Sequence, residues 1–282
     1  MGVVRIDAVI SGSAKVSVIV PTHNRPEFLA EALHSVAAQT ERSFECIVVD
    51  DGSAEPVRLP FADVRFRLVR SESSQGVAAA RNLGIQRATG DYVAFLDDDD
   101  LWAPTRLQHA LNQAKPGVVV ICALGRVGSS RVDIPVLVQP LADTILNRSP
   151  PNLGAVIVAR DACPEFDTRY AACEDLDWWL RLAPKVRPVV TRDAGWLWRQ
   201  HDGPRGSVSA QARIDGSLHL LRHHDDYFNR HRTAAAYRWV RIGWLARASG
   251  QRSLTFRAGC RAFTAYPRLR TAARVVRMFI GK

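Results

Sequence analysis

The sequence contains no long hydrophobic segment. No run of about eighteen or more apolar residues occurs in the 282 residues, so the sequence predicts no membrane-spanning helix. The N-terminal stretch is too weakly apolar for a signal peptide, and Gly2 is not followed by the Ser or Thr of a myristoylation signal. We therefore expect residues 1–14 to form a loose leader.

Cysteine is also scarce. The five cysteines are odd in number and scattered, and no Cys-x-x-Cys pair occurs. This spacing predicts neither a cysteine zinc site nor a disulfide framework. With no export signal, we expect the protein in the reducing cytoplasm.

Acidic residues are few in the C-terminal part of the chain. From Gly195 onward, 17 Lys and Arg face 4 Asp, a charge of +13, whereas the whole chain carries +10 and the remainder therefore −3. Such clustering predicts an anionic partner, which is a lipid surface, nucleic acid or a phosphorylated substrate. A genome bias explains the preference for arginine over lysine, but it does not explain the clustering.

Strand-like and helix-like segments alternate along the first half of the chain. Apolar runs at 16–20, 46–49, 92–96 and 118–124 predict buried strands, and helices are predicted from Pro26 to Gln39 and within QGVAAARNLGIQRATGDY. This alternation predicts an α/β fold with a mainly parallel sheet and helices on both faces. Short strands are also predicted in FRLVR and GAVIVARDAC, and a helix in PTRLQHALNQA. Further on, we predict loops over 129–151, a helix over 174–182, a last strand in VVTRDAGWLW, and arginine-rich helices beyond 206.

Four consecutive aspartates follow the apolar run Tyr92 to Leu96. One interpretation is a solvated acidic turn. The other is a cation site, because crowded carboxylates repel one another unless a positive charge lies among them. Oxygen ligands suit Mg²⁺ or Mn²⁺, and open α/β sheets bind ligands beyond the carboxyl ends of their strands. The position of Asp97 to Asp100 at a strand end favours the cation site.

Several stretches in this order resemble the family 2 glycosyltransferases of the GT-A fold. They are VSVIVPTHNR, IVVDDGS, GVAAARNLGI, GDYVAFLDDDD, FDTRYAACEDLDWWLRL and WRQHDGPRGSVS. The resemblance covers about residues 15–210. It implies a GT-A type mixed, mainly parallel sheet flanked by helices, and an inverting sugar transfer from a nucleotide-diphosphate donor, most simply a UDP-sugar. The residues beyond it predict a C-terminal helical basic extension.

The resemblance also implies a donor site and a metal site. Pro21 and Asp51 match positions that hold the nucleotide base, and Asp99 matches the main metal ligand. The full nucleotide-sugar set implied is Pro21, Asn24, Arg25, Asp51, Arg81, Asp97 and Asp98. The metal set is Asp99, Asp97 and His201, holding Mg²⁺ or Mn²⁺, although His201 is equally explained as an exposed loop residue.

The stretch CEDLDWW carries the implied acceptor site. Asp175 matches the family's general base, which takes the proton of the acceptor hydroxyl. Glu174 and Trp178 are the implied acceptor-binding residues. The alternatives are that the acids stabilise the first turn of a helix through its dipole and that Trp178 belongs to the core.

Four segments are expected: the leader 1–14, a nucleotide-sugar-binding half 15–115, an acceptor-binding half 116–206 of the same domain, and a helical basic tail 207–282. The tail ends in a basic amphipathic helix with an apolar stripe of Leu269, Ala272, Val276 and Phe279. This helix suits either an anionic membrane surface or packing on its own domain. The expected partners are a nucleotide-diphospho-sugar donor, a glycan or lipid-linked acceptor and the inner face of the membrane.

Two other functions were weighed. A nucleotidyltransferase can share a related sheet, but its chemistry needs no acceptor base in CEDLDWWLRL. A nucleic-acid binder using the basic tail leaves the acidic strand ends unexplained, and the sequence has no RNP, zinc-finger or helix-turn-helix signature. No nucleic-acid partner is therefore expected.

Overall fold

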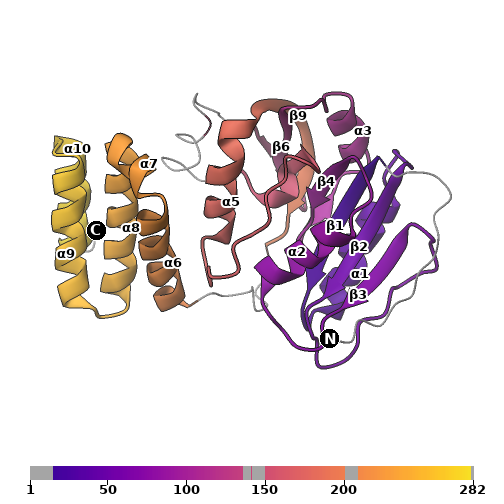
Figure 1. Ribbon diagram of the computed structural model, residues 1–282, viewed down its shortest axis with the longest axis horizontal. Coiled ribbons are helices and arrows are strands. Elements are labelled where there is room, and N and C mark those ends of the chain that lie inside the picture. Colours follow the sequence, from indigo (N-terminus) through magenta and orange to yellow (C-terminus); the bar gives the residue numbers. More distant parts are fainter. Residues whose placement is uncertain (1–14, 136–140, 142–149, 201–208, 281–282) are drawn as a thin grey trace. The chain divides into compact units, whose positions relative to one another are not determined.

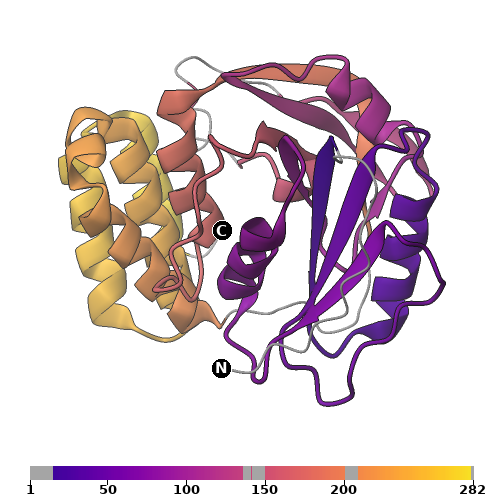
Figure 2. The ribbon, with the colours of Figure 1, turned by 45° about the vertical axis from the view of Figure 1, so that its right-hand side comes forward.

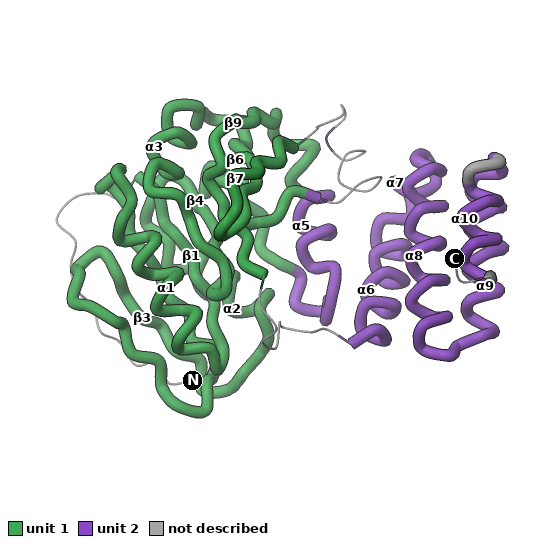
Figure 3. The backbone as a smooth tube through the Cα atoms, turned by 180° about the vertical axis from the view of Figure 1, so that it is seen from behind, with its two compact units in different colours: residues 1–137, 151–166, 181–202 green, residues 138–150, 167–180, 203–282 purple. Residues whose placement is uncertain are grey.

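The computed structural model describes residues 15–135, 141, 150–200 and 209–280. The chain divides into two compact units (Figure 3). The sheet unit comprises residues 1–137, 151–166 and 181–202, and the helical unit comprises residues 138–150, 167–180 and 203–282. The units cut the chain differently from the predicted halves, because residues 167–180 group with the C-terminal helices. The predicted leader lies outside the described residues.

One mixed β-sheet builds the sheet unit. Its strands are β1 (Val16–Thr22), β2 (Phe44–Asp50), β3 (Phe66–Arg70), β4 (Tyr92–Phe95), β5 (Leu101–Trp102), β6 (Val118–Arg126), β7 (Ser129–Asp133), β8 (Val156–Ala159) and β9 (Arg187–Trp198). The strand order is β3-β2-β1-β4-β8-β6-β9-β5, and β7 pairs with β6. Parallel ladders join β3 to β2, β2 to β1, β1 to β4, and β6 to β9, whereas β8, β5 and β7 pair antiparallel through shorter ladders.

The core of this unit follows from the apolar character of its central strands. Every residue of β1 and β2 is buried, as expected for strands that are covered on both faces. Helices α1 (Pro26–Ala37) and α2 (Val77–Arg87) lie on opposite faces of these strands (Figure 2), and α3 (Arg106–Leu111) packs on β9 and β6. A Cβ on Gly84 would lie 2.4 Å from Ile19 Cγ2, so the glycine allows α2 to pack tightly on β1. The predicted α/β fold class is confirmed.

Two short strands were not predicted. The segment 129–133 was expected to be a loop, yet it forms β7, which is antiparallel to β6. Its sequence SSRVD is almost entirely exposed, so it lacks the alternating burial that reveals a strand. β5 has only two residues and owes its existence to its pairing with β9. Neither strand gives a local hydrophobic signal, because β5 is too short and β7 is polar and exposed.

The helical unit contains most of α5 (Glu174–Leu182) together with α6 (Ala210–His223), α7 (Asp225–Arg230), α8 (Arg232–Ala248), α9 (Arg252–Ala265) and α10 (Leu269–Ile280), labelled in Figure 1. The bounds of α5 are those predicted. Close packing of α10 relies on glycine, because a Cβ on Gly243 of α8 would meet Met278 and one on Gly259 of α9 would meet Val275. No helix within the described ranges is long and apolar enough to cross a membrane.

The last helix packs on its own unit by a face that differs from the predicted apolar stripe. Met278 is fully buried against α8 and α9, and Thr271 is buried on the same side of α10. Val276 and Phe279 belong to the predicted stripe, but they remain 54% and 47% exposed. The helix therefore satisfies one of the two alternatives, packing on its own unit, while leaving part of its apolar surface uncovered.

Candidate functional site

Carboxylates that follow two strands, β2 and β4, lie at one edge of the sheet. β1 lies between β2 and β4 and runs parallel to both, with Thr22 opposite Asp50 and Ile19 opposite Phe95. Because the carboxyl ends of parallel strands point the same way, the acids that follow β2 and β4 face the same edge. This is the edge at which the sequence predicted the donor site.

The four aspartates after β4 alternate in burial. Asp98 and Asp100 are buried, whereas the side chains of Asp97 and Asp99 are 30% and 19% exposed. Residues 97–100 form a turn, closed by a hydrogen bond from Asp100 N to Asp97 O at 3.1 Å. The alternation divides the run into two carboxylates turned into the protein and two that solvent can reach.

Asp98 is bound by the first strand and its turn. It accepts hydrogen bonds from Thr22 Oγ1 at 2.7 Å and from Arg25 Nη1 at 3.1 Å. Burial raises the pKa of Asp98 to about 6, and the Thr22 hydroxyl and the Arg25 charge only partly offset this increase. Asp98 therefore joins β1 to β4 and takes up a proton more readily than an exposed aspartate.

Asp100 is bound by the last strand. Trp196 Nε1 donates to its Oδ2 at 2.8 Å, and the backbone N–H of Arg199 donates to its Oδ1 at 3.1 Å. Burial and the charge of Asp97 together raise the pKa of Asp100 to about 7. With both oxygens used by the protein, Asp100 anchors the end of β9.

The two accessible aspartates have arginine partners. Arg81 Nη2 lies 2.8 Å from Asp97 Oδ1, and Arg25 Nη1 lies 2.9 Å from Asp99 Oδ2. Positive charge is thus already drawn to this cluster. Carboxylate oxygens fit Mg²⁺ or Mn²⁺, and two accessible carboxylates would leave most coordination positions to phosphate and water. The donor set fits the implied metal.

Asp51 holds the loop that leads into α2. Its carboxylate accepts hydrogen bonds from Ser74 Oγ and from the backbone N–H groups of Gln75 and Gly76, at 2.7–2.9 Å. The turn that follows requires glycine, since Gly52 has φ of +68° and a Cβ there would lie 2.5 Å from Ser74 N. A base N–H would have to share a carboxylate that already accepts three bonds, so contact of Asp51 with the nucleotide stays a prediction.

The turn after β1 is fixed by Asn24. This residue has φ of 56°, an uncommon conformation that asparagine tolerates. Its Oδ1 accepts from Ala54 N at 2.8 Å and its N–H donates to Ser53 Oγ at 2.9 Å. Pro21 is buried at the end of β1. The structure thus brings the predicted residues Pro21, Asn24, Arg25, Asp51, Arg81, Asp97, Asp98 and Asp99 to one end of the sheet unit.

The proposed acceptor residues lie in the helical unit at the start of α5. Asp175 is partly exposed, and its Oδ1 accepts a hydrogen bond from Leu176 N at 2.8 Å. Cys173, just before the helix, has φ of 70°, which is uncommon for a residue other than glycine. Glu174, Asp175 and Asp177 all lie in the first turn, where the helix dipole favours acids.

Trp178 requires a correction. Its side chain is fully buried and packs edge-to-face on Trp179, with ring centroids 5.2 Å apart. A side chain with no exposed surface has none to offer to an acceptor. Of the two interpretations weighed for Trp178, the core residue is the one that the structure supports.

A comparison with family models decides the family. The model described as "Glycosyl transferase family 2" matches residues 17–166, more than half of the chain. The chain belongs to glycosyl transferase family 2. The match includes the whole acidic edge from β1 to β8 and ends before α5.

The similar curated proteins are also glycosyltransferases. The putative colanic acid biosynthesis glycosyl transferase WcaA of Escherichia coli K12 is 27% identical over 232 residues, which cover 76% of this chain and 83% of WcaA. An uncharacterized glycosyltransferase of Rickettsia felis is 43% identical over 98 residues, and the chain spans only 16% of its length. The glucosyltransferase WfgD of E. coli is 38% identical over 96 residues, which span 38% of that protein.

Solved structures share the fold of this family 2 glycosyltransferase. TarS 1–349 of S. aureus in complex with UDP-GlcNAc aligns with a TM-score of 0.62 at 19% identity, covering 95% of this chain and 92% of that one. The mannosyltransferase PcManGT of Pyrobaculum calidifontis, in complex with GDP-Man and Mn²⁺, aligns with a TM-score of 0.58 at 22% identity, covering 94% and 79%. The chain therefore has the GT-A fold of these glycosyltransferases.

Four further residues concern this edge of the sheet, one of them predicted from the sequence and three not. His201, predicted as a metal ligand, lies outside the described residues. The roles of Thr22, Trp196 and Asp50 were missed. Asp50 is fully buried, and although burial raises its pKa, hydrogen bonds from Ser53, Val57 and Arg70 hold that pKa below its usual value. The one available signal for Asp50 was that an acidic residue ends an otherwise apolar strand.

Proposed function

We propose that this family 2 glycosyltransferase moves a sugar from a nucleotide-diphosphate donor, a UDP-sugar, to a glycan or lipid-linked acceptor with inversion at the anomeric carbon. The observation that carries the proposal is the alternating aspartate run, which exposes Asp97 and Asp99 at the carboxyl edge of the sheet while Asp98 and Asp100 bind the protein. The TarS structure with UDP-GlcNAc and the name of WfgD, which includes UDP-Glc and a diphosphoundecaprenol acceptor, support the choice of donor and acceptor.

Asp97 and Asp99 hold the cation in this proposal, with His201 as a third ligand. A divalent cation, Mg²⁺ or Mn²⁺, supplies Lewis-acid stabilisation for the leaving diphosphate. Arg25 and Arg81, which contact the same carboxylates, add positive charge near the phosphates. Pro21, Asn24 and Asp51 shape the base pocket at the neighbouring strand ends.

Asp175 accepts the proton of the acceptor hydroxyl as that oxygen attacks the sugar. Attack on the face opposite the nucleotide inverts the anomeric centre, so one base suffices and no covalent intermediate forms. Glu174, its neighbour in the first turn of α5, orients the acceptor. The partial exposure of Asp175 supports this role, because a base must be reachable by the hydroxyl.

The C-terminal helices bring the enzyme to the inner face of an anionic membrane. Exposed apolar side chains lie on α9, Phe256 and Phe263, and on α10, Val276 and Phe279. Arginines are interspersed among them in sequence. Apolar side chains that insert at the headgroup boundary, with arginines that bind anionic lipid, form an interfacial anchor. Such an anchor suits a lipid-linked acceptor.

A screen of nucleotide sugars tests the donor and metal parts of the proposal. The chain is incubated with each sugar nucleotide, with Mg²⁺, Mn²⁺ or excess chelator, and release of nucleoside diphosphate is measured. We expect release from a UDP-sugar that requires the divalent cation and that Asp99→Ala abolishes. The matched control is Asp91→Ala, an exposed aspartate before β4. Equal release in chelator, or full activity of Asp99→Ala, contradicts the metal role.

A further inference from the structure

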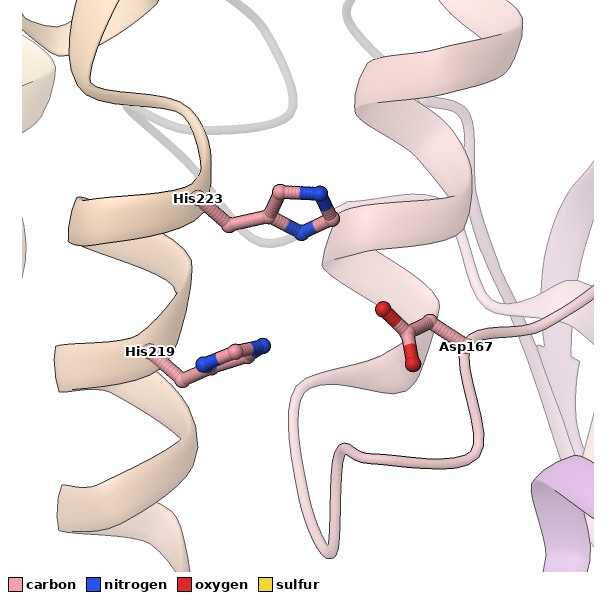
Figure 4. A group of neighbouring side chains, drawn as sticks. All are labelled: Asp167, His219 and His223. Atoms are coloured by element: carbon pink, nitrogen blue, oxygen red, sulfur yellow. The ribbon is translucent and has the colours of Figure 1, made fainter.

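Three side chains in the helical unit have the composition of a transition-metal site. His219 and His223 lie one turn apart on α6 and project toward Asp167, which precedes α5 (Figure 4). One potential ligand atom of each residue lies within 4.8 Å of the other two. Two histidines four residues apart share a helix face. Imidazole nitrogen with carboxylate oxygen is a ligand combination typical of Zn²⁺.

One ring nitrogen of His219 has no hydrogen-bond partner among the described residues. This atom, Nε2, is buried. A buried polar nitrogen without a protein partner costs free energy, which a bound cation or an ordered water would recover. The ring is held edge-to-face on Tyr170, with centroids 4.5 Å apart. A cation bound to this nitrogen would supply the missing partner without reorganising the ring.

Glycine fixes the distance between the two segments that contribute ligands. A Cβ on Gly216 of α6 would lie 2.2 Å from the carbonyl oxygen of Ala172. Only glycine allows α6 to approach the backbone so closely, and Gly216 lies one helical turn before His219. Tyr170 adds a second tie, since its hydroxyl lies 3.1 Å from His223 Nδ1. The cluster is therefore positioned by close backbone packing and does not depend on exposed side chains alone.

Asp167 forms an ion pair with Arg169. Asp167 accepts hydrogen bonds from Arg169 Nη2 at 2.6 Å and from Arg169 Nε at 3.0 Å. The side chain of Arg169 is 66% exposed, so the guanidinium can turn into solvent at little cost. A divalent cation would compete with this guanidinium for the carboxylate.

A second group of potential ligands shares His223. It consists of Asp177, His223 and His224. In this group His224 Nε2 already lies 2.8 Å from Asp177 Oδ1, and Asp177 is fully buried. His223 Nδ1 lies 3.5 Å from the same oxygen, so Asp177 is placed to orient His223, as carboxylates behind metal-bound histidines commonly do. The group with the unpartnered nitrogen is the better metal site.

We propose that Asp167, His219 and His223 bind a Zn²⁺-class divalent cation, with water in the remaining positions, and that this cation ties the segment before α5 to α6. Zn–N and Zn–O bonds of about 2.0–2.2 Å require the three atoms to move together slightly, which side-chain rotation allows. The site is separate in composition from the oxygen-only site at Asp97 and Asp99. It does not depend on the proposed sugar transfer.

Zn²⁺ binding to the full chain tests the site. The chain is stripped with chelator, saturated with Mg²⁺ to occupy oxygen-only sites, and titrated with Zn²⁺ by calorimetry, with Co²⁺ absorption as a second readout. We expect His219→Ala, His223→Ala and Asp167→Asn each to weaken Zn²⁺ binding by at least about tenfold. The control is His34→Ala, an exposed histidine on α1. Unchanged Zn²⁺ affinity in His219→Ala overturns the proposal, and His219→Gln replaces that variant if it fails to fold.

Two further variants separate the possible ligand sets. Arg169→Gln removes the competitor for Asp167, so we expect tighter Zn²⁺ binding, and unchanged or weaker binding overturns the role of Asp167. His224→Gln keeps a donor for Asp177 and should leave Zn²⁺ affinity nearly unchanged. Loss of binding in His224→Gln together with retention in His219→Ala overturns the proposed set in favour of the Asp177 group.

Discussion

The sheet unit and the helical unit handle charge in different ways. In the sheet unit the buried acids Asp50, Asp98 and Asp100 each accept a hydrogen bond from a neighbouring strand, through Arg70, Thr22 and Trp196 respectively. In the helical unit the charge is mostly arginine on exposed helix surfaces, and acid is gathered with histidine at Asp167 and Asp177. The first arrangement joins strands and leaves only selected oxygens for a ligand. The arrangement in the helical unit places histidine nitrogens beside single carboxylates, those of Asp167 and Asp177.

This difference distinguishes the structural carboxylates of each cluster from those that a ligand can reach. A carboxylate whose oxygens already accept hydrogen bonds from strands is not available to a ligand, whereas Asp97 and Asp99 retain accessible surface. Hard cations suit the oxygen-only edge, and Zn²⁺-class cations suit the histidine cluster.

The largest effect is expected from Asp175→Asn in the helical unit. Asparagine keeps the size of the side chain but takes no proton at neutral pH, so sugar transfer should fall by about 10²–10⁴-fold. Donor affinity should hardly change, because the proton belongs to the acceptor. Transfer rate and donor affinity are measured on the same folded variant, with Asp215→Asn on α6 as the control. Retained transfer would reduce Asp175 to a first-turn helix acid, since asparagine serves helix starts nearly as well as aspartate.

Asp98→Asn should change the pH dependence of stability in the sheet unit. In the folded protein the pKa of Asp98 is about 6, above the ordinary value of 3.8. The stability that protonated Asp98 contributes is therefore fully present below about pH 4 and is lost as the pH rises through 6. Between pH 4 and 7 the free energy of unfolding of the wild type should fall by roughly 2–3 kcal/mol relative to Asp98→Asn. The amide can still accept from Arg25 and donate to Thr22.

Denaturant unfolding of both proteins across this pH range, without divalent cations, measures the difference. Asp91→Asn, at an exposed position, should follow the wild type. Parallel pH profiles for the wild type and Asp98→Asn would mean that Asp98 ionises in the fold as easily as it does in the unfolded chain.

Glycine-to-alanine substitutions compare how the two units tolerate closer packing. The added methyl of Gly216→Ala meets the backbone carbonyl of Ala172, whereas that of Gly84→Ala meets the side chain of Ile19, which can rotate. We expect Gly216→Ala to cost about 1–3 kcal/mol of stability and Gly84→Ala to cost less. Chemical denaturation of both variants measures the order, and a larger loss in Gly84→Ala would reverse the argument.

The smallest effect concerns the exposed face of α10. Replacing Val276 and Phe279 by serine leaves the buried residues Thr271 and Met278 in place. Binding to vesicles that contain anionic lipid should weaken by about tenfold, which corresponds to roughly 1.4 kcal/mol of lost apolar insertion. Sedimentation with vesicles measures it, and Ala273→Ser, also exposed on α10, is the control. Equal binding of all three proteins would remove α10 from the membrane proposal.

Most of the fold could be predicted because its signals are local. Continuous apolar runs marked β1, β2, β4 and β6, and the acidic first turn with the following apolar residues marked α5 to the residue. β7 could not be predicted, because its exposed residues are ordered by pairing with β6 and by no hydrophobic pattern of their own. The burial of Trp178 likewise depends on packing that sequence order does not reveal.

The site was predictable in composition and only partly in geometry. The strand ends and the family pattern predicted which residues lie together at this edge. The division of the aspartate run into buried and accessible side chains depends on Thr22 and Trp196, which are distant in sequence. The histidine cluster had a visible signal, the spacing of His219 and His223 on a helix. Its third member, Asp167, lies 52 positions before His219, so the spacing alone could not complete it.

The division of the chain into units has a consequence for synthesis. The polypeptide passes from one unit to the other five times, so neither unit is a continuous stretch of sequence. A ribosome delivers residues 167–180 before any of α6–α10 exists. Asp177 emerges 47 residues ahead of His224, the partner of its buried carboxylate. A nascent chain that stalls in this interval lacks His224, the hydrogen-bond partner of the buried Asp177 carboxylate, until α6 and the residue after it have been synthesised.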